Sequence, residues 1–256
     1  MNTDKTWNYF GTHDPYYGVL TNEEFRGGAN RERFWRTGQT HIDRLLSLLQ
    51  QLFNLPAPVR FRRALDFGCG VGRLTLPLSR ACDEVVGVDV SPAILAKAQS
   101  DCQQMGVANA RFLLTDDELS AVSGAFDLVH TFIVLQHIRP RRGYKIIESL
   151  LSRLAPNGIG ALEMTYQRDA TPHVELAYRL CTRMPLLTRL LNVLVLKRPA
   201  GQLLAEMNEY DLGRVMTILC DHGCQRVHLD FSASNARWYK TRGVYLFFQK
   251  SPVPVW

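Results

Sequence analysis

The chain has 256 residues, 46% of them hydrophobic and 21% charged, a composition that supports one sizeable core and excludes disordered, collagen-like and coiled-coil proteins. No stretch approaches the roughly 20 uninterrupted apolar residues of a membrane-spanning helix, and residues 1–8 lack the apolar run of a secretory signal. Six cysteines without a CxxC pair favour free thiols in a reducing compartment. We therefore expect a globular, cytoplasmic protein without a transmembrane segment.

The formal net charge of +6 is unevenly distributed along the chain. Residues 138–204 hold 11 Lys and Arg against 4 Asp and Glu, whereas residues 64–137 hold 4 against 9. A basic segment suits a nucleic acid, an anionic small molecule or a lipid headgroup. Charge alone leaves these three partners open.

Residues 1–63 are first rich in aromatic side chains and then helical, with apolar residues at core spacing. From residue 64 onward, short runs of β-forming residues alternate with helical patterns, which predicts a parallel sheet covered by helices. We predict strands at 64–67, 84–90, 110–114, 126–131 and 160–165. We predict helices at 73–80, 92–105, 144–154 and 211–220. Two β-rich runs, 226–231 and 243–250, predict an antiparallel pair at the sheet edge.

The predicted fold class is therefore α/β, a Rossmann-like doubly wound sheet that is mostly parallel, with an antiparallel C-terminal strand pair and helical lid segments. Four segments are expected: an N-terminal cap at 1–63, a ligand-binding core at 64–169, a helical insertion at 170–207, and the end of the core at 208–256. Ligands of open α/β sheets bind at the carboxyl edge of the strands. The cap and the insertion are therefore candidates for a lid over that edge.

The most informative stretch is ALDFGCGVGRLT at residues 64–75, which combines a strand, a glycine-rich turn and the start of a helix. Gly68, Gly70 and Gly72 let the backbone approach a ligand closely. A dinucleotide site needs G-x-G-x-x-G, but its sixth position here is Arg73. No G-K-[ST] follows, so the loop is not a P-loop.

A D-x-G-x-G-x-G pattern at the end of a first strand resembles the class I S-adenosylmethionine-dependent methyltransferases of the small-molecule type. The resemblance covers residues 64–163. It implies S-adenosylmethionine as cofactor and S-adenosylhomocysteine as product. It also implies that the methionine part of the cofactor is held by Asp66, Gly68, Cys69, Gly70 and Gly72.

Acids after the second and third strands complete the cofactor site that the resemblance implies. Asp89 closes VVGVD and is placed to accept both ribose hydroxyls. The alternative, that Asp89 caps the next helix, is weakened because Ser91 can serve as that cap. Asp116 or Asp117 follows the third strand, where the family places an acid on the adenine amino group. Either acid fits that position.

The run FDLVHTFIVLQHI at residues 126–138 resembles the family's fourth strand and the helix after it, which border the methyl group. This places Ile133 against the cofactor and His137 near the reaction chamber. A histidine titrates near neutrality, so His137 is the candidate general base, with a packing role as the alternative. Cys220 and Cys224 with one intervening histidine fall short of a metal site, and Gly223 is interpreted as a helix cap.

Three other features have two interpretations each. Tyr16 and Tyr17 either close over the cofactor or pack in the core. Gly38, before a helix expected from Gln39, either lies at a helix N-terminus beside the cofactor or is a plain turn. The apolar stretch 184–196, flanked by basic residues, either contacts a membrane or an acyl chain, or forms a lid helix or a dimer contact.

Together these features predict a methyltransferase that acts on an oxygen or nitrogen atom of a small molecule, as in natural-product or secondary metabolism. The acceptor is expected to be anionic or lipophilic, and the protein a monomer or homodimer without stably bound nucleic acid. The first alternative is an RNA or protein methyltransferase that uses the basic residues 138–204. The second is a non-methylating protein that binds S-adenosylmethionine.

Overall fold

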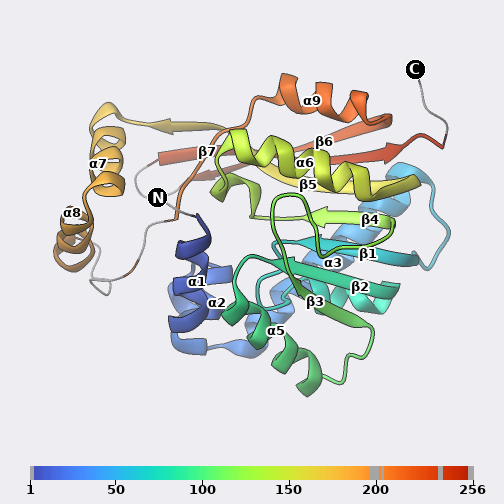
Figure 1. Ribbon diagram of the computed structural model, residues 1–256, viewed down its shortest axis with the longest axis horizontal. Helices are drawn as coiled ribbons and strands as arrows, with labels where there is room; N and C mark the ends of the chain where they lie inside the picture. Colours follow the sequence, from blue (N-terminus) through green and yellow to red (C-terminus); the bar gives the residue numbers. More distant parts are fainter. Residues whose placement is uncertain (1–2, 196–201, 203–204, 236–238, 253–256) are drawn as a thin grey trace.

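A computed structural model describes residues 3–195, 202, 205–235 and 239–252. Its centre is one seven-stranded sheet with the order β3-β2-β1-β4-β5-β7-β6. The strands are β1 (Phe61–Phe67), β2 (Cys82–Asp89), β3 (Ala110–Leu114), β4 (Phe126–Thr131), β5 (Leu154–Ala170), β6 (Cys224–Asn235) and β7 (Tyr239–Lys250). β1 to β5 pair in parallel, and β7 lies antiparallel between β5 and β6 (Figure 1). The Rossmann-like sheet with an antiparallel C-terminal pair is therefore confirmed.

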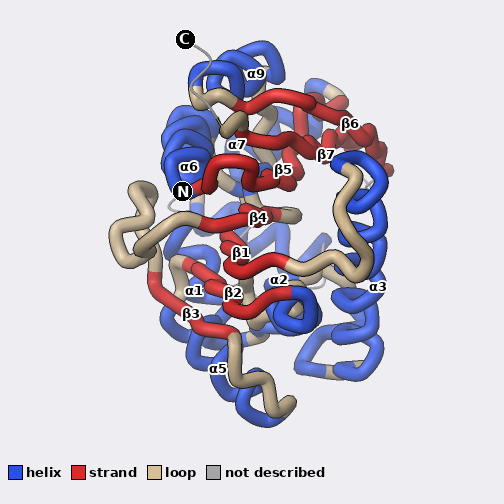
Figure 2. The backbone as a smooth tube through the Cα atoms, turned by 90° about the vertical axis from the view of Figure 1, so that its right-hand side faces the viewer, coloured by secondary structure: helices blue, strands red, loops and turns tan. Residues whose placement is uncertain are grey.

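Helices cover both faces of the sheet, so the carboxyl-terminal halves of its inner strands are buried on both sides. One face carries α6 (Pro140–Arg153) and α9 (Leu212–Asp221). The other carries α3 (Arg31–Phe53), the short α4 (Thr75–Leu78) and α5 (Pro92–Gln104). Figure 2 shows α6 and α3 on opposite sides of the strands. The topology brings the carboxyl ends of β1, β2 and β4 together at one edge.

Several predicted boundaries differ from the structure. The helix expected at 73–80 is only the four residues of α4, followed by the 3-10 turn η2 (Ser79–Ala81), because the glycine-rich turn extends to Leu74. The helix expected from Gln39 begins at Arg31, so Gly38 lies in its interior. The fourth strand is followed by the short turn η3 (Leu135–His137) rather than directly by a helix. The strand expected at 160–165 extends to Ala170 because β7 pairs along its length.

The N-terminal segment folds against α5 through an aromatic cluster. It contains α1 (Thr3–His13), α2 (Pro15–Val19) and the 3-10 segment η1 (Glu23–Gly28). Tyr16 and Tyr17 are both buried, and the Tyr16 hydroxyl donates to Asp101 Oδ2 at 2.8 Å. These two tyrosines are therefore packing residues of the cap, as one of the two interpretations expected.

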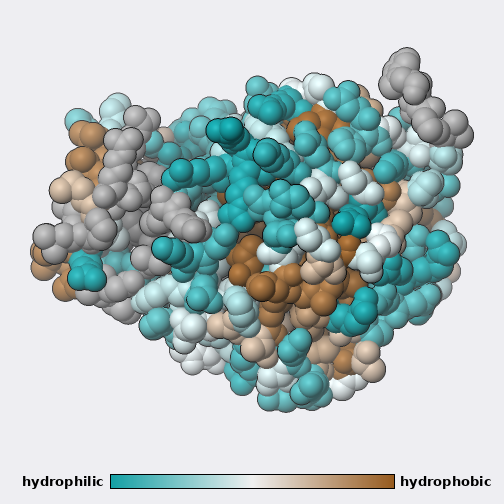
Figure 3. All heavy atoms as spheres, viewed as in Figure 1, coloured by the Kyte–Doolittle hydropathy of each residue, from teal (hydrophilic) through white to brown (hydrophobic). Residues whose placement is uncertain are grey.

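The insertion after β5 extends away from the sheet (Figure 1). It contains α7 (Pro172–Arg183), α8 (Pro185–Leu190) and the π turn η4 (Leu191–Val195). Figure 3 shows apolar side chains on this end of the molecule. The exposed ones are Leu176, Leu180, Met184, Leu190, Val193, Leu194 and Val195. Residue 196 and the basic pair Lys197 and Arg198 lie outside the described residues, and the membrane or dimer contact stays a prediction.

Within the described residues, no helix is both long and apolar enough to cross a membrane. Over the same ranges, no group of three or more His, Cys, Asp and Glu side chains is arranged to hold a metal ion. Cys69, Cys82, Cys102, Cys220 and Cys224 are free thiols. Gly223 follows α9 with a φ of +70°, the left-handed conformation of a helix C-cap.

Candidate active site

The glycine-rich turn between β1 and α4 takes a conformation that only glycine adopts readily. Gly68, Gly70 and Gly72 have φ values of +72°, +55° and +84°. Space is also limiting, because a Cβ on Gly68 would lie 2.4 Å from Val134 Cγ2, and one on Gly70 would lie 2.4 Å from Val19 Cγ2. The Gly68 and Cys69 amides donate to Val88 O at 2.8 and 3.0 Å, which fixes the turn to the end of β2. Buried Cys69 contributes its backbone to this turn.

Asp89 ends β2 directly beside this turn. Its Oδ2 accepts from the Gly70 amide at 3.1 Å and its Oδ1 accepts from the Ser91 amide at 3.0 Å. Ser91 Oγ accepts from Ile94 N, so Ser91 is the cap of α5. Burial raises the pKa of Asp89 to about 6. These backbone donors do not use all the lone pairs of the carboxylate, which can therefore accept from a further donor.

The turn and Asp89 form one wall of a cavity of about 1090 Å³. Residues of α1 and α2 form the opposite wall, so the N-terminal segment closes over the carboxyl edge of the sheet. The cavity is large enough for a nucleoside-containing cofactor and part of a second ligand. Its polar lining includes Asp66, Arg73, Asp89, Asp116, Asp117, His137 and Arg142.

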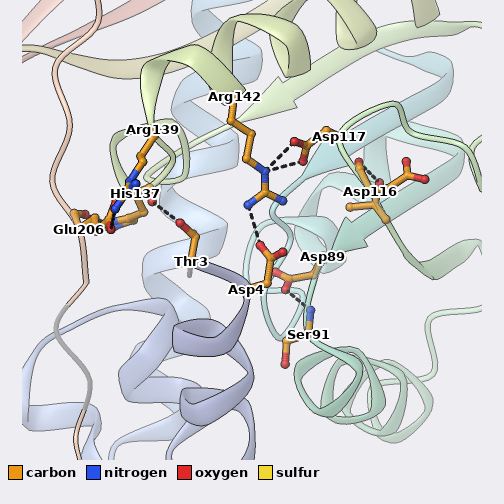
Figure 4. A network of polar contacts seen from close by, with 11 residues as sticks. Thr3, Asp4, Asp89, Ser91, Asp116, Asp117, His137, Arg139, Arg142 and Glu206 are labelled. Atoms are coloured by element: carbon orange, nitrogen blue, oxygen red, sulfur yellow. Dashed lines mark hydrogen bonds and ion pairs between the residues drawn. The ribbon is translucent and has the colours of Figure 1, made fainter. Parts of the chain in front are cut away.

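The two acids after β3 both line the cavity, and both have local partners. Asp116 Oδ1 accepts from the Ser120 amide at 2.8 Å, and this hydrogen bond lowers the pKa of Asp116. Both carboxylate oxygens of Asp117 accept from Arg142 Nε, at 2.6 and 2.7 Å. Arg142 Nη1 also lies 2.7 Å from Asp4 Oδ1 on α1 (Figure 4). Arg142 therefore ties the N-terminal helix to the loop that carries Asp117.

Replacing Arg142 with alanine is expected to loosen α1 from the cavity. Partly exposed ion pairs contribute about 1 kcal/mol, so amide hydrogen exchange in residues 3–13 should become about fivefold faster in the variant. Hydrogen-exchange mass spectrometry measures this directly. Arg141→Ala, at an exposed neighbouring position, is the matched control. Unchanged exchange in Arg142→Ala would show that the ion pair does not hold the helix.

Asp66, near the end of β1, makes its hydrogen bonds to other side chains of the protein. Its side chain is buried, with Oδ1 2.8 Å from His130 Nδ1 and Oδ2 accepting from Thr75 Oγ1 at 2.6 Å. His130 is fully buried on β4. The carboxylate therefore joins the first turn of α4 to β4, while it also lines the cavity.

Arg73 is a cavity residue that the sequence analysis missed. Its side chain is buried, and its Nη1 lies 3.4 Å from Thr37 Oγ1. Among the described residues, its Nε has no hydrogen-bond partner. Burial lowers the pKa of Arg73 to about 10. A buried, incompletely paired guanidinium suits a carboxylate ligand. The only signal in the sequence was a cation at a position where a dinucleotide loop has glycine.

His137 and Ile133 lie on the segment between β4 and α6. His137 Nδ1 lies 2.7 Å from the Glu206 carbonyl oxygen, and burial lowers the pKa of this histidine (Figure 4). Ile133 has a φ of +60°, which is strained for a β-branched residue. Its amide donates to Glu163 Oε2 at 3.0 Å. No spacing in the sequence singled out Glu163 as a site residue. In the structure, burial raises the pKa of Glu163 to about 7.

Comparisons with known proteins agree with this geometry. The family model described as a methyltransferase domain matches residues 64–158. The 23S rRNA (uracil(1939)-C(5))-methyltransferase RlmD of Burkholderia pseudomallei (strain 1710b) is 37% identical over 122 residues, which are 45% of this chain and 25% of that protein. The chain thus spans about a quarter of the length of the curated relatives it matches.

Two solved structures are similar over almost the whole chain. Magnesium protoporphyrin IX methyltransferase from Synechocystis PCC 6803, with bound S-adenosylhomocysteine, has a TM-score of 0.61 and 20% identity and covers 98% of this chain and 100% of that one. The N-methyltransferase NodS from Bradyrhizobium japonicum WM9, in complex with the same ligand, has a TM-score of 0.57 and 16% identity. The similarity covers 98% of this chain and 99% of that one. At these identities the likeness concerns the fold.

The sheet order, the glycine turn and the buried acid after β2 define a Rossmann-like domain of the methyltransferase type. Residues 64–158 match the methyltransferase domain family, so the resemblance of this segment to the S-adenosylmethionine-dependent methyltransferases is confirmed.

Proposed function

We propose that the chain transfers a methyl group from S-adenosylmethionine to an oxygen or nitrogen atom of a small molecule. The observation that supports this most is the pairing of Asp89 with the glycine turn on the wall of a cavity larger than the cofactor needs. The four-segment organisation, a place in natural-product or secondary metabolism, the cytoplasmic location and the monomeric or homodimeric state belong to the same proposal.

The residues present fit the cofactor. Asp89 is a buried carboxylate with a raised pKa and remaining acceptor capacity, so donors such as the ribose hydroxyls would stabilise its charged form. The incompletely paired Arg73 guanidinium suits the cofactor's carboxylate. We assign the methionine part to the turn with Asp66, Gly68, Cys69, Gly70 and Gly72, the adenine to Asp116 or Asp117, and the methyl region to Ile133.

S-adenosylmethionine supplies an electrophilic methyl group, whose transfer needs alignment and exclusion of water more than it needs a strong acid or base. Residues of α1 and α2 close the cavity and supply that exclusion. His137 remains the proposed general base. Its lowered pKa keeps the ring neutral, and a hydrogen bond from Nδ1 to the Glu206 carbonyl would leave Nε2 as the proton acceptor.

RNA is the second candidate acceptor, and one observation favours it. The curated relatives in the sequence comparison are named as methyltransferases of 23S rRNA. Binding to RNA would weaken steeply with added salt, because phosphate contacts release counterions. If the protein retains an rRNA fragment at low salt and loses it at high salt, RNA is supported over a small molecule as the acceptor.

Calorimetric titration with S-adenosylmethionine and S-adenosylhomocysteine tests the cofactor assignment, with NAD as the matched negative control. Binding of both sulfur ligands and not of NAD is the expected result. Formation of S-adenosylhomocysteine in the presence of small phenols or amines then tests transfer. If S-adenosylmethionine binds but is not consumed with any acceptor tried, the non-methylating alternative is favoured. Failure of both sulfur ligands to bind would overturn the proposal.

A further inference from the structure

A second cavity of about 720 Å³ adjoins the first. The two cavities share Phe132, Ile133, Gln136, Met207 and Tyr239 as lining residues. Beyond this shared wall, the second cavity is lined from α3, β5, β6 and β7. Ile133, the residue assigned to the methyl region, therefore separates the cofactor cavity from a chamber that could hold the methyl acceptor.

The chamber contains polar groups that lack partners. Within the described part of the chain, His41 Nε2, Gln136 Oε1 and Tyr245 Oη are buried without a hydrogen bond. Burial and the neighbouring charges of His130, Arg73 and Arg44 lower the pKa of His41 to about 3, so its ring is neutral. Buried polar atoms of this kind normally have a partner, and a ligand would supply one. The set is rich in acceptors, which suits a ligand with several donors.

The charged and aromatic groups of the chamber indicate the chemical class of its ligand. One oxygen of Glu163 is held by the Ile133 amide, and the carboxylate faces the chamber. The other ionised groups that line the chamber are Asp230 and Arg44, 3.5 Å apart and both largely exposed. The rings of His41, Phe132 and Tyr245 lie 4.0 to 6.1 Å apart between centroids. A carboxylate beside aromatic faces is the arrangement that recognises an organic cation.

We propose that this chamber binds the methyl acceptor as an amine, with the Glu163 carboxylate facing its ammonium group. The inference rests on the proposed function and narrows its acceptor. The ammonium gives one proton to the Glu163 carboxylate, which becomes a carboxylic acid and, for an amine acceptor, takes the role of base that was proposed above for His137. The freed nitrogen lone pair forms the new bond to the methyl carbon as the carbon–sulfur bond breaks. S-adenosylhomocysteine and a methylated ammonium result, and Glu163 later releases its proton to water.

Benzylamine and benzyl alcohol are matched probes for this chamber, since they differ in the charged nitrogen. Both are titrated into the protein saturated with S-adenosylhomocysteine at about pH 8, where the amine is protonated and Glu163 is ionised. We expect benzylamine to bind about 10- to 100-fold more tightly than the alcohol, the contribution of hydrogen bonds to a charged group. Glu163→Gln should remove this preference.

Glutamine keeps an oxygen for the Ile133 amide, so Glu163→Gln is expected to fold and to bind S-adenosylhomocysteine as before. Its melting temperature without ligand should rise at about pH 8, because the substitution removes a carboxylate whose charged form is destabilised by burial. Tyr245→Phe removes only the hydroxyl and should weaken the binding of benzylamine about threefold. Glu148→Gln, exposed on α6, is the matched control and should change none of these values.

Equal binding of the two probes, or an unchanged preference in Glu163→Gln, would overturn the inference. If S-adenosylhomocysteine binds but benzylamine does not, only the amine assignment fails. If S-adenosylhomocysteine itself does not bind, the proposed function fails with it. Methyl transfer to a phenol and not to benzylamine would assign the chamber to a hydroxyl acceptor and would also overturn the inference.

Discussion

Asp89→Ala is expected to weaken the binding of S-adenosylhomocysteine by about 100-fold or more. The wild-type carboxylate is proposed to accept from two ribose hydroxyls, and hydrogen bonds to a charged group contribute about 1.5 to 3 kcal/mol each. Loss of both gives at least this factor. Calorimetric titration of the two proteins measures it. Glu118→Ala, which removes an exposed acid of the loop after β3 that does not line the cavity, is the comparison and should leave the affinity unchanged.

The same residue predicts how binding depends on pH. Burial raises the pKa of Asp89 to about 6 in the free protein, and donors from the ribose would favour its charged form. The affinity for S-adenosylhomocysteine should therefore fall as the pH falls through about 6. The folded pKa lies above the ordinary value of 3.8, so the contribution of Asp89 to stability is present below pH 4 and is lost as the pH rises through about 6. Binding that does not weaken at low pH would contradict this assignment.

Gly38→Ala is expected to destabilise the protein by about 3 kcal/mol, although alanine normally favours a helix interior over glycine by about 1 kcal/mol. A Cβ on Gly38 would lie 2.1 Å from the backbone oxygen of Arg73 and 3.0 Å from its carbonyl carbon. The backbone of Arg73 belongs to the glycine turn and cannot move without displacing the wall of the first cavity that is proposed to hold the cofactor. The clash therefore outweighs the gain in helix propensity.

Thermal unfolding measures this effect. A loss of about 3 kcal/mol corresponds to a melting temperature lower by roughly 6 to 12 °C for a protein of this size. Gly213→Ala in α9 is the matched control, because its Cβ would meet only the Asp211 carboxylate, at 3.2 Å. This control should stay within about 1 kcal/mol of the wild type. Equal stability of Gly38→Ala and the wild type would mean that α3 and the turn can separate freely.

The sequence predicted the parts of this protein that repeat a local pattern. Alternating β-rich and helical runs, with the glycine turn at the end of the first strand, were sufficient for the parallel sheet and its antiparallel edge pair. The close approach of Gly38 to Arg73 joins two segments far apart in the chain, and no local pattern reports it. The start of α3 was missed for a related reason, since aromatic residues before Gln39 pack against α5 and resembled a separate cap.

Glu163, His41 and Tyr245 could not be selected from the sequence for a different reason. They come from three elements, β5, α3 and β7, and no spacing connects them. Only the order of strands in the sheet brings β7 beside β5, and only packing places α3 across from both. Arg73 was visible in the sequence, but its burial and its unpartnered nitrogen were not.

The polar residues proposed to hold the cofactor and those proposed to hold the acceptor come from different parts of the chain. The turn, Asp89 and Asp116 all lie within residues 64–158, the segment shared with other methyltransferases. His41, Glu163 and Tyr245 lie outside that segment. Similarity within residues 64–158 therefore bears on the cofactor side of the site and carries no information about the chamber residues His41, Glu163 and Tyr245.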